Sequence, residues 1–373
     1  DEAPEPGERG GARGRPRVLL RVRPDAFLVC GAKISEDHIT VTLMDFEGGE
    51  QLNHVARMPR GSDSAAPVAG HLRAAVAAHH GVAPENIMLG EGIDGLLGYL
   101  VRMLVTPGTP VVTSLGTYPT FNYHVTGYGG VLRAVPYHGD ATDPLALATA
   151  ARETGAPLVY LANPDNPMGG WHSAGMISAL IAALPEDAVL CLDEAYADFA
   201  PPEAIPPIDV SEQRVIRMRT FSKAHGLAGA RIGYAIGHAD LIAAFDRVRN
   251  HFGLGVMAQA GALAALSDRR WLAEVVARVA EGRARLGEIA AARGLRALPS
   301  ATNFVTIDCG RDGAFARRVL AGMIARGVFI RMPFVAPQDR CVRISVGRPA
   351  ELAIVAQAPP AALDEAERAT RHA

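Results

Sequence analysis

Residues 220–234, TFSKAHGLAGARIGY, follow an apolar run and contain Lys223, one of only two lysines in the chain. The other is Lys33, and every remaining cation of this class is an arginine. A lysine amine can form an imine with an aldehyde, whereas a guanidinium stays protonated and cannot. Lys223 is therefore a candidate for imine formation, and the residues around it should include groups that could bind an aldehyde-containing ligand.

Hydroxyl groups and an arginine surround Lys223 in this glycine-rich stretch. Thr220 and Ser222 precede the lysine, and Arg231 follows it by eight residues. These are groups that bind phosphate oxygens, so the stretch suits a phosphate with an aldehyde beside it. The apolar run RVIRMRT at 214–220 predicts a strand that delivers all four side chains to one edge of a sheet.

Continuous apolar runs without alternation recur along the chain and are typical of strands buried on both faces. They lie at 86–89, 109–114, 157–163, 188–195, 214–220 and 231–237. Two segments, 71–82 and 92–105, have apolar residues at helical spacing and lie on either side of the first run at 86–89. The pattern predicts an α/β fold with a mixed, mostly parallel sheet and helices on both faces. Ligands of such sheets sit at the carboxyl ends of the strands.

A second unit follows an amphipathic helix predicted at 268–295. TNFVTID, a helix at 312–326, GVFIRMP and CVRISVG then form a β-α-β-β pattern, which predicts a smaller C-terminal α/β domain. The expected organisation is a disordered leader (1–16), an N-terminal segment (17–65), a large domain (66–255), a small domain (256–356) and a tail without an obvious core face (357–373).

The N-terminal segment has weaker signals. VLLRV (18–22), FLVCGAKI (27–34) and HITVTLMDF (38–46) are candidate strands, and RMPRGSDSAAP (57–67) has the composition of a loop. The leader lacks the apolar region of a signal peptide, and no apolar run approaches the ~20 residues of a membrane span.

Composition excludes several classes of partner. The net charge is −2 and the arginines are spread among acids, so no basic stripe predicts nucleic-acid binding. Cys30, Cys191, Cys309 and Cys341 are far apart and form no zinc-binding or disulfide pattern, which favours reduced thiols in a cytoplasmic protein. Small molecules are the expected partners.

Further polar residues follow other strands. The run at 188–195 predicts a strand that ends on Asp193, with Glu194 and Tyr196 just behind it. Asn166 lies in NPDNPMGG, which follows the strand predicted at 157–163. A carboxylate such as Asp193 could bind a metal, cap a helix or hold a protonated ring nitrogen. No other acid or histidine stands at matching spacing, so no metal site is predicted.

LGEGIDG (89–95) joins a strand to a helix start, where backbone N–H groups of Gly92, Ile93 and Asp94 could bind phosphate. The same glycines spell GxGxxG, the dinucleotide fingerprint, so a nicotinamide-dependent oxidoreductase is one alternative. That fingerprint also requires an acid about 20 residues further on, and the next strand ends without one. It would also leave Lys223, Asp193 and Asn166 unexplained.

Taken in order, GEGIDG, TYPTF, NPDNPMG, DEAY, TFSKAHGLAGARIGY and RISVG resemble the fold-type I aminotransferases that depend on pyridoxal 5′-phosphate (PLP), most closely the histidinol-phosphate aminotransferase group. The resemblance covers about residues 68 to 356. It implies a large PLP domain, a small C-terminal domain and a homodimer with active sites at the subunit boundary. The expected activity moves an amino group from an amino acid or amine to a 2-oxo acid such as 2-oxoglutarate, by a ping-pong mechanism.

The resemblance also implies roles for individual residues. Lys223 would form the Schiff base with PLP, Asp193 would pair with the pyridine nitrogen, and Phe121 would stack on the ring. Asn166 and Tyr196 would bind the phenolic oxygen, and Arg343 and Arg331 would bind the substrate. The phosphate would be held by Gly92, Ile93, Asp94, Thr220, Ser222 and Arg231.

Several family features are missing. The Arg-Tyr-Pro motif has only Arg57-Met58-Pro59 as its nearest match, Gly95 stands where an acid or amide is common, and Phe121 replaces a tyrosine. Threonine-phosphate decarboxylases resemble the same group, so a lyase is a second alternative, because the bond that breaks depends on Å-scale positioning. A non-catalytic PLP sensor would need a DNA-binding module, for which the leader is too short.

Overall fold

The computed structural model describes residues 29–34, 38–44, 50–57 and 65–371, in two compact units divided at residue 65. The first unit is a three-stranded antiparallel sheet of β1 (Val29–Ile34), β2 (His38–Met44) and β3 (Glu50–Arg57). Two of the three strands predicted in this segment are thus confirmed, and β3 was not predicted. The candidate strand at 18–22 and the leader at 1–16 lie outside the described residues.

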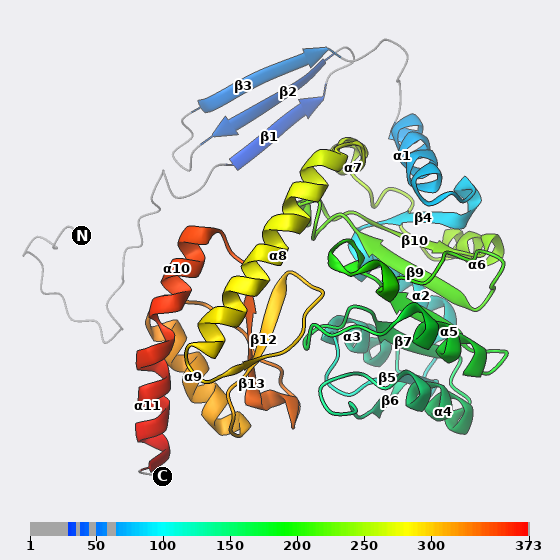
Figure 1. The fold of residues 1–373 in the computed structure, drawn as a ribbon. Helices are drawn as coiled ribbons and strands as arrows, with labels where there is room; N and C mark the ends of the chain where they lie inside the picture. Colours follow the sequence, from blue (N-terminus) through cyan, green and yellow to red (C-terminus); the bar gives the residue numbers. More distant parts are fainter. Residues whose placement is uncertain (1–28, 35–37, 45–49, 58–64, 372–373) are drawn as a thin grey trace, which may run out of the picture. The chain divides into compact units, whose positions relative to one another are not determined.

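The second unit contains a seven-stranded sheet in the order β4-β10-β9-β8-β7-β5-β6 (Figure 1). Its strands are β4 (Ile87–Gly90), β5 (Pro110–Ser114), β6 (Val131–Val135), β7 (Leu158–Ala162), β8 (Val189–Asp193), β9 (Val215–Thr220) and β10 (Gly233–Gly237). Strand β10 alone runs opposite to the other strands of this sheet, so the predicted mixed, mostly parallel sheet is confirmed. The edge strand β6 was not predicted, because it exposes most of its side chains and lacks a buried apolar run.

Helices cover both faces of this sheet, as predicted. Along β7, Leu158 and Tyr160 point into a core with α2 (Gly92–Leu104) and α3 (Pro119–Gly127). The alternate residues Val159 and Leu161 point into a core with α4 (Pro144–Thr154) and α5 (Ala174–Ala183). Both sets of side chains are buried, which is why these strands are continuous apolar runs in the sequence.

A third core closes the β4 edge. It contains α1 (Ala65–His80), β4, β10 and α7 (Val256–Ser267), with α6 (Ala239–Ala244) beside it. Because α7 packs in this core, we propose that it belongs with the large sheet, whereas the small domain was expected to begin at residue 256. Short 3-10 helices connect the elements: η1 (Pro84–Asn86), η2 (Ala197–Phe199), η3 (Pro202–Ala204), η4 (Ala228–Ala230), η5 (Phe245–Arg247) and η6 (Gln338–Arg340).

The smaller part of this unit is built on an antiparallel sheet of β11 (Arg296–Ala297), β12 (Phe304–Asp308) and β13 (Cys341–Ser345). Its helices are α8 (Arg269–Ala291), α9 (Gly313–Ala325), α10 (Pro349–Gln357) and α11 (Pro359–Arg371). The prediction of a strand at GVFIRMP (327–333) is wrong, because Arg331 forms only an isolated bridge with Arg343. The third strand of the sheet is β11 instead.

The C-terminal tail also differs from the expectation. Helix α11 buries Ala362 and Ala366 in the same core as α9, and Gly322 of α9 is in close contact with Ala362. Alanine at these positions lets the helices approach closely, but in the sequence it is too weak a signal to indicate a core face. We therefore propose that the small domain runs from about residue 268 to residue 371.

Hydrogen bonds and ion pairs join the small domain to the large sheet. Thr306 Oγ1 donates to the carbonyl of Pro167 over 2.7 Å, and Gln338 Nε2 donates to that of Gly139 over 2.8 Å. Asp140 also pairs with Arg340 at 2.7 Å. These contacts place the small domain beside the loops that follow β6 and β7. Among the described residues, no helix is long and apolar enough to cross a membrane.

Candidate active site

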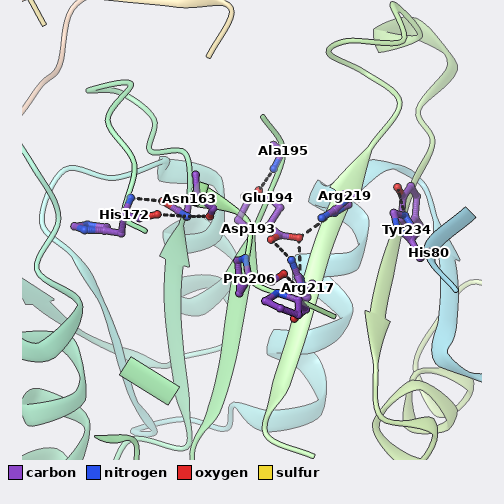
Figure 2. Close-up of polar contacts among 12 residues, drawn as sticks. His80, Asn163, His172, Asp193, Glu194, Ala195, Pro206, Arg217, Arg219 and Tyr234 are labelled. Atoms are coloured by element: carbon purple, nitrogen blue, oxygen red, sulfur yellow. Dashed lines mark hydrogen bonds and ion pairs between the residues drawn. The ribbon is translucent and has the colours of Figure 1, made fainter. Parts of the chain in front are cut away.

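The carboxyl ends of β8 and β9 bring Asp193 and Lys223 to one cavity. Asp193 is 5% exposed, and its two oxygens accept hydrogen bonds from the Tyr160 hydroxyl at 2.7 Å and from the backbone N–H of Ala195 at 3.0 Å (Figure 2 draws the second of these). Burial raises the pKa of the Asp193 carboxyl, and the two donors and Lys223 act in the opposite direction. The site thus contains a buried, hydrogen-bonded carboxylate.

Lys223 lines the same cavity, with its Nζ atom 5.3 Å from the ring centre of Tyr196. Burial lowers the pKa of the Lys223 amine, and the nearby cations Arg343 and Arg231 lower it further, whereas Asp193 raises it. A lowered pKa increases the neutral fraction of the amine, which is the form that acts as a nucleophile or a base.

The amino end of α2 forms a cradle for an anion. No side chain caps this helix, and Ile93 and Asp94 of its first turn line the cavity, so the N–H groups of that turn are available to bind an anion there. Gly92 has a φ of +77°, and a Cβ there would lie 2.6 Å from a terminal nitrogen of Arg231. Glycine adopts this φ without strain and leaves room for the guanidinium at the helix end. Thr220 and Ser222 complete the lining, and the Ser222 N–H donates to Thr220 Oγ1 at 3.0 Å.

The interpretation of GxGxxG as a dinucleotide fingerprint fails on topology. The strand before these glycines, β4, is an edge strand antiparallel to β10. The dinucleotide fingerprint belongs to a parallel βαβ unit, so the glycines here serve the cradle and the packing of α2 instead.

Asn166, Tyr196 and Arg343 are connected by hydrogen bonds. The Asn166 side-chain carbonyl accepts from Arg343 Nη1, and its amide donates to the Tyr196 hydroxyl at 3.5 Å. The Arg343 guanidinium also lies 4.7 Å from the ring centre of Phe304, from β12 of the small domain. The structure therefore brings residues of both domains to one site, as expected for these three residues.

Phe121 does not reach the cavity. It is fully buried and stacks on Tyr160, with ring centres 4.4 Å apart and planes at 14°. The aromatic residue that lines the cavity is Tyr118, three positions earlier in the motif TYPTF. Helix α3 begins at Pro119 with Tyr118 as its N-cap. Phe121 is therefore in the first turn of the helix and points into the core, whereas Tyr118 stays at the helix start beside the cavity.

A second, larger chamber adjoins the first, and Tyr118, Asn166, Tyr196 and Lys223 border both. Arg331 and Arg343 line this chamber, and their backbones pair through two hydrogen bonds. Two guanidinium groups consequently face a chamber that is continuous with the Lys223 amine.

Glu194 is held away from the cavity. It accepts from buried Arg217 at 2.6 and 2.9 Å and from partly buried Arg219 at 2.9 Å (Figure 2). These cations lower the pKa of the Glu194 carboxyl against the effect of burial. This acid of the DEAY motif is structural. Within the part of the chain that the structure describes, no group of three His, Cys, Asp or Glu side chains is placed to hold a metal ion.

The fold and this donor set define a class of enzyme. A lysine, a buried carboxylate and a cationic helix-end cradle at the carboxyl edge of a mixed sheet fit the aldehyde, the ring nitrogen and the phosphate of PLP. Residues 62–358 match the family model for aminotransferase class I and II. The chain belongs to this family, and it is a PLP-dependent aminotransferase.

Relatives within the family are similar over most of their length. Histidinol-phosphate aminotransferase 1 of Mesorhizobium japonicum is 37% identical over 76% of this chain and 78% of its own. Histidinol-phosphate aminotransferase 2 of Carboxydothermus hydrogenoformans is 35% identical over 75% and 77%, respectively. The crystal structure of histidinol-phosphate aminotransferase from Sinorhizobium meliloti in complex with pyridoxal-5′-phosphate is 52% identical, with a TM-score of 0.79, and covers 80% of this chain and 82% of that chain.

Proposed function

We propose that this aminotransferase takes the amino group of histidinol phosphate and passes it to a 2-oxo acid such as 2-oxoglutarate. The observation that carries the proposal is the pair Arg331 and Arg343, side by side in a chamber continuous with Lys223. Two guanidinium groups suit the phosphate of an amino-alcohol ester and, in the second half of the reaction, the carboxylates of a 2-oxo acid. The names of the relatives support the same substrate.

The cofactor supplies an electron-withdrawing ring that makes the proton on the substrate's Cα removable. In our proposal, Asp193 holds the charge of the ring nitrogen, because a buried carboxylate favours a protonated partner. Lys223 would hold the cofactor aldehyde, and its amine, whose pKa is lowered by burial, would serve as the general base for the proton at the substrate's Cα.

The remaining residues bind and orient. Asn166 and Tyr196 would hydrogen-bond the phenolic oxygen, and the Tyr118 ring would cover the cofactor ring. The α2 amino end with Thr220, Ser222 and Arg231 would hold the phosphate of the cofactor. Arg343 is already aligned by Asn166 and by the Phe304 ring, so substrate binding need not order it.

We also propose that the enzyme acts as a homodimer, as the family resemblance implies. Tyr123, Phe329 and Phe334 are 69%, 73% and 81% exposed, and Tyr123 and Phe334 border the chamber of Arg331 and Arg343. Large aromatic side chains left open in one chain are typical of a surface that a partner covers.

The experiment is a donor screen on the purified holoenzyme with 2-oxoglutarate as acceptor. Histidinol phosphate should give glutamate with ping-pong kinetics. Arg331→Ala should raise KM for histidinol phosphate by about tenfold or more, since a charged hydrogen bond is worth roughly 1.5–3 kcal/mol. Arg326→Ala is the matched control, because it removes a partly exposed guanidinium that pairs with Glu365 at the end of α9 and lines neither chamber. Release of CO2 without an oxo-acid acceptor, or kinetics that require a ternary complex, would contradict the proposal.

A further inference from the structure

A tight turn between β6 and α4 presents its tip to the small domain. The backbones of His138 and Ala141 pair through hydrogen bonds of 2.8 and 3.2 Å, which leaves Gly139 and Asp140 at the tip. Gly139 has a φ of +61°, which glycine adopts without strain. Its carbonyl accepts from Nε2 of Gln338, a buried residue of the small domain, over 2.8 Å. The turn is therefore docked, and the acidic side chain at its tip has a defined position.

Asp140 completes a closed ring of four alternating charges. Its carboxylate accepts from Arg340 at 2.7 Å and from Arg296 at 3.2 Å. Both arginines also donate to Asp308, each over 3.0 Å. Arg296 and Asp308 are opposite each other in the pairing of β11 with β12, and the partner of Asp308 on β13 is Cys341. Three members of the ring are thus assembled at one end of the small sheet, whereas Asp140 comes from the large domain.

Charge balance gives Asp140 its importance in this ring. Two arginines and one aspartate leave the small-domain members with a net charge of +1, which Asp140 neutralises. The side chains of Asp140 and Arg340 are only 25% and 23% exposed. Burial alone would raise the pKa of the Asp308 carboxyl, but the N–H of Gly310 and the two arginines lower it. Removal of one charge from such a partly buried network is costly, because water replaces the lost partner only in part.

The ring lies at the start of the strand that carries Arg343. Arg340 ends η6, and β13 begins at the next residue. Further along this strand, Arg343 donates to the Asn166 side chain of the large domain, and its backbone pairs with that of Arg331. The strand is consequently fixed to the large domain at two points, and the ring of charges is the one outside the chamber.

We propose that Asp140 is a positioning residue: by closing the ring of charges, it sets the place at which Arg343 and Arg331 face the chamber beside Lys223. Asp140 is not among the described residues that line either chamber, so it acts through the small domain and not on the substrate itself. The role rests on the proposed function, in which the two arginines bind the substrate, and it adds a residue of the opposite domain to substrate binding.

Asp140→Asn removes the charge and keeps the shape of the side chain. In the holoenzyme, KM for histidinol phosphate and for 2-oxoglutarate should rise roughly fivefold. The value of kcat should change by less than about twofold, because Lys223 and Asp193 both belong to the large domain. The matched control is Asp246→Asn, which breaks an ion pair with Arg249 inside the large domain and should leave both KM values unchanged.

Arg296→Gln separates a role of charge from a role of shape. Arg296 is 60% exposed, and without its charge the small-domain members are neutral and no longer require an anion. The double variant Asp140→Asn/Arg296→Gln should therefore recover most of the affinity that Asp140→Asn loses. Losses that simply add in the double variant would overturn the proposal.

Hydrogen exchange of the holoenzyme without substrate measures the same effect independently of the donor. The segments 296–308 and 338–346 should exchange faster in Asp140→Asn than in the wild type, and more slowly again in the double variant, whereas 158–162 in the large sheet should not change. Faster exchange in all three segments, or in none, would overturn the positioning role. So would faster exchange at the small sheet with unchanged KM values.

A wild-type measurement keeps the proposal testable if Asp140→Asn does not fold. Raising NaCl to about 1 M screens the ring, so exchange of 338–346 should accelerate relative to 158–162, and an unchanged ratio would contradict the role of charge. Failure of the wild type to use histidinol phosphate would contradict the proposed function instead. The KM of the donor identified by the screen then takes its place, and an Asp140→Asn variant that leaves this KM unchanged would overturn the positioning role.

Discussion

The Tyr160 hydroxyl donates a 2.7 Å hydrogen bond to Oδ2 of Asp193, and both groups lie in the buried wall of the active site. Tyr160 is fully buried, and burial together with the Asp193 charge raises the pKa of its phenol, which therefore stays a donor. The second Asp193 oxygen is satisfied by the N–H of Ala195. The carboxylate is thus fixed in position from two sides before any cofactor binds.

Tyr160→Phe should lower the affinity for PLP without disturbing the core, because the phenyl ring can still stack on Phe121. Loss of the donor raises the pKa of Asp193 further, so the ionised form disappears at a higher pH. The acidic limb of kcat/KM should move to higher pH, and the dissociation constant for PLP should rise roughly tenfold or more. Titration of the apoenzyme with PLP measures the second effect. An unchanged PLP affinity and an unchanged acidic limb would show that Ala195 alone suffices.

Lys223→Ala should abolish transamination and the visible absorbance of the lysine-bound cofactor. Reduction of the holoenzyme with borohydride should fix the cofactor to the peptide that contains Lys223, as detected by mass spectrometry. The chain supplies its own control, because Lys33 is the only other lysine. Lys33→Ala should keep both the absorbance and the labelled peptide, and labelling at Lys33 in the wild type would refute the assignment.

The raised pKa of Asp165 predicts that the free energy of unfolding depends on pH. It is buried between Tyr137 and the backbone of Met168, and burial raises its pKa from 3.8 to about 6. The unfolded chain therefore loses this proton near pH 4, whereas the folded chain keeps it until about pH 6. Between these values the folded state binds more protons, so stability falls as the pH rises, by up to about 3 kcal/mol.

Urea unfolding of the wild type and Asp165→Asn at several pH values measures this contribution. The amide cannot ionise, so the variant should lack the decline between pH 4 and pH 6. Parallel curves for the two proteins would mean that Asp165 is already ionised when folded.

Glu194→Gln should destabilise the fold by about 3–5 kcal/mol, because it leaves Arg217 and Arg219 buried without their counter-charge. The control is Glu274→Gln, whose carboxylate is partly exposed and pairs with exposed arginines on α8, and it should cost less than about 1 kcal/mol. Urea unfolding of both variants at neutral pH gives the comparison. A small loss in Glu194→Gln would show that the two arginines find other partners.

The sequence determined the class of fold and the centre of the site. Strands buried on both faces are mostly apolar, so β7 and β8 could be predicted, and the residues after them meet at one sheet edge. In β9 the apolar run is interrupted by Arg217 and Arg219, which pair with Glu194. The rarity of lysine in this chain pointed directly to Lys223. These features are local, and local patterns are what a sequence shows directly.

Tertiary structure decided what depends on contacts between distant segments. Tyr160 lies mid-strand among core residues, and only the pairing of β7 with β8 places its hydroxyl on Asp193. The start of α3 turned Phe121 inward and left Tyr118 at the cavity. Side-chain direction follows from packing, and packing is a property of the whole fold.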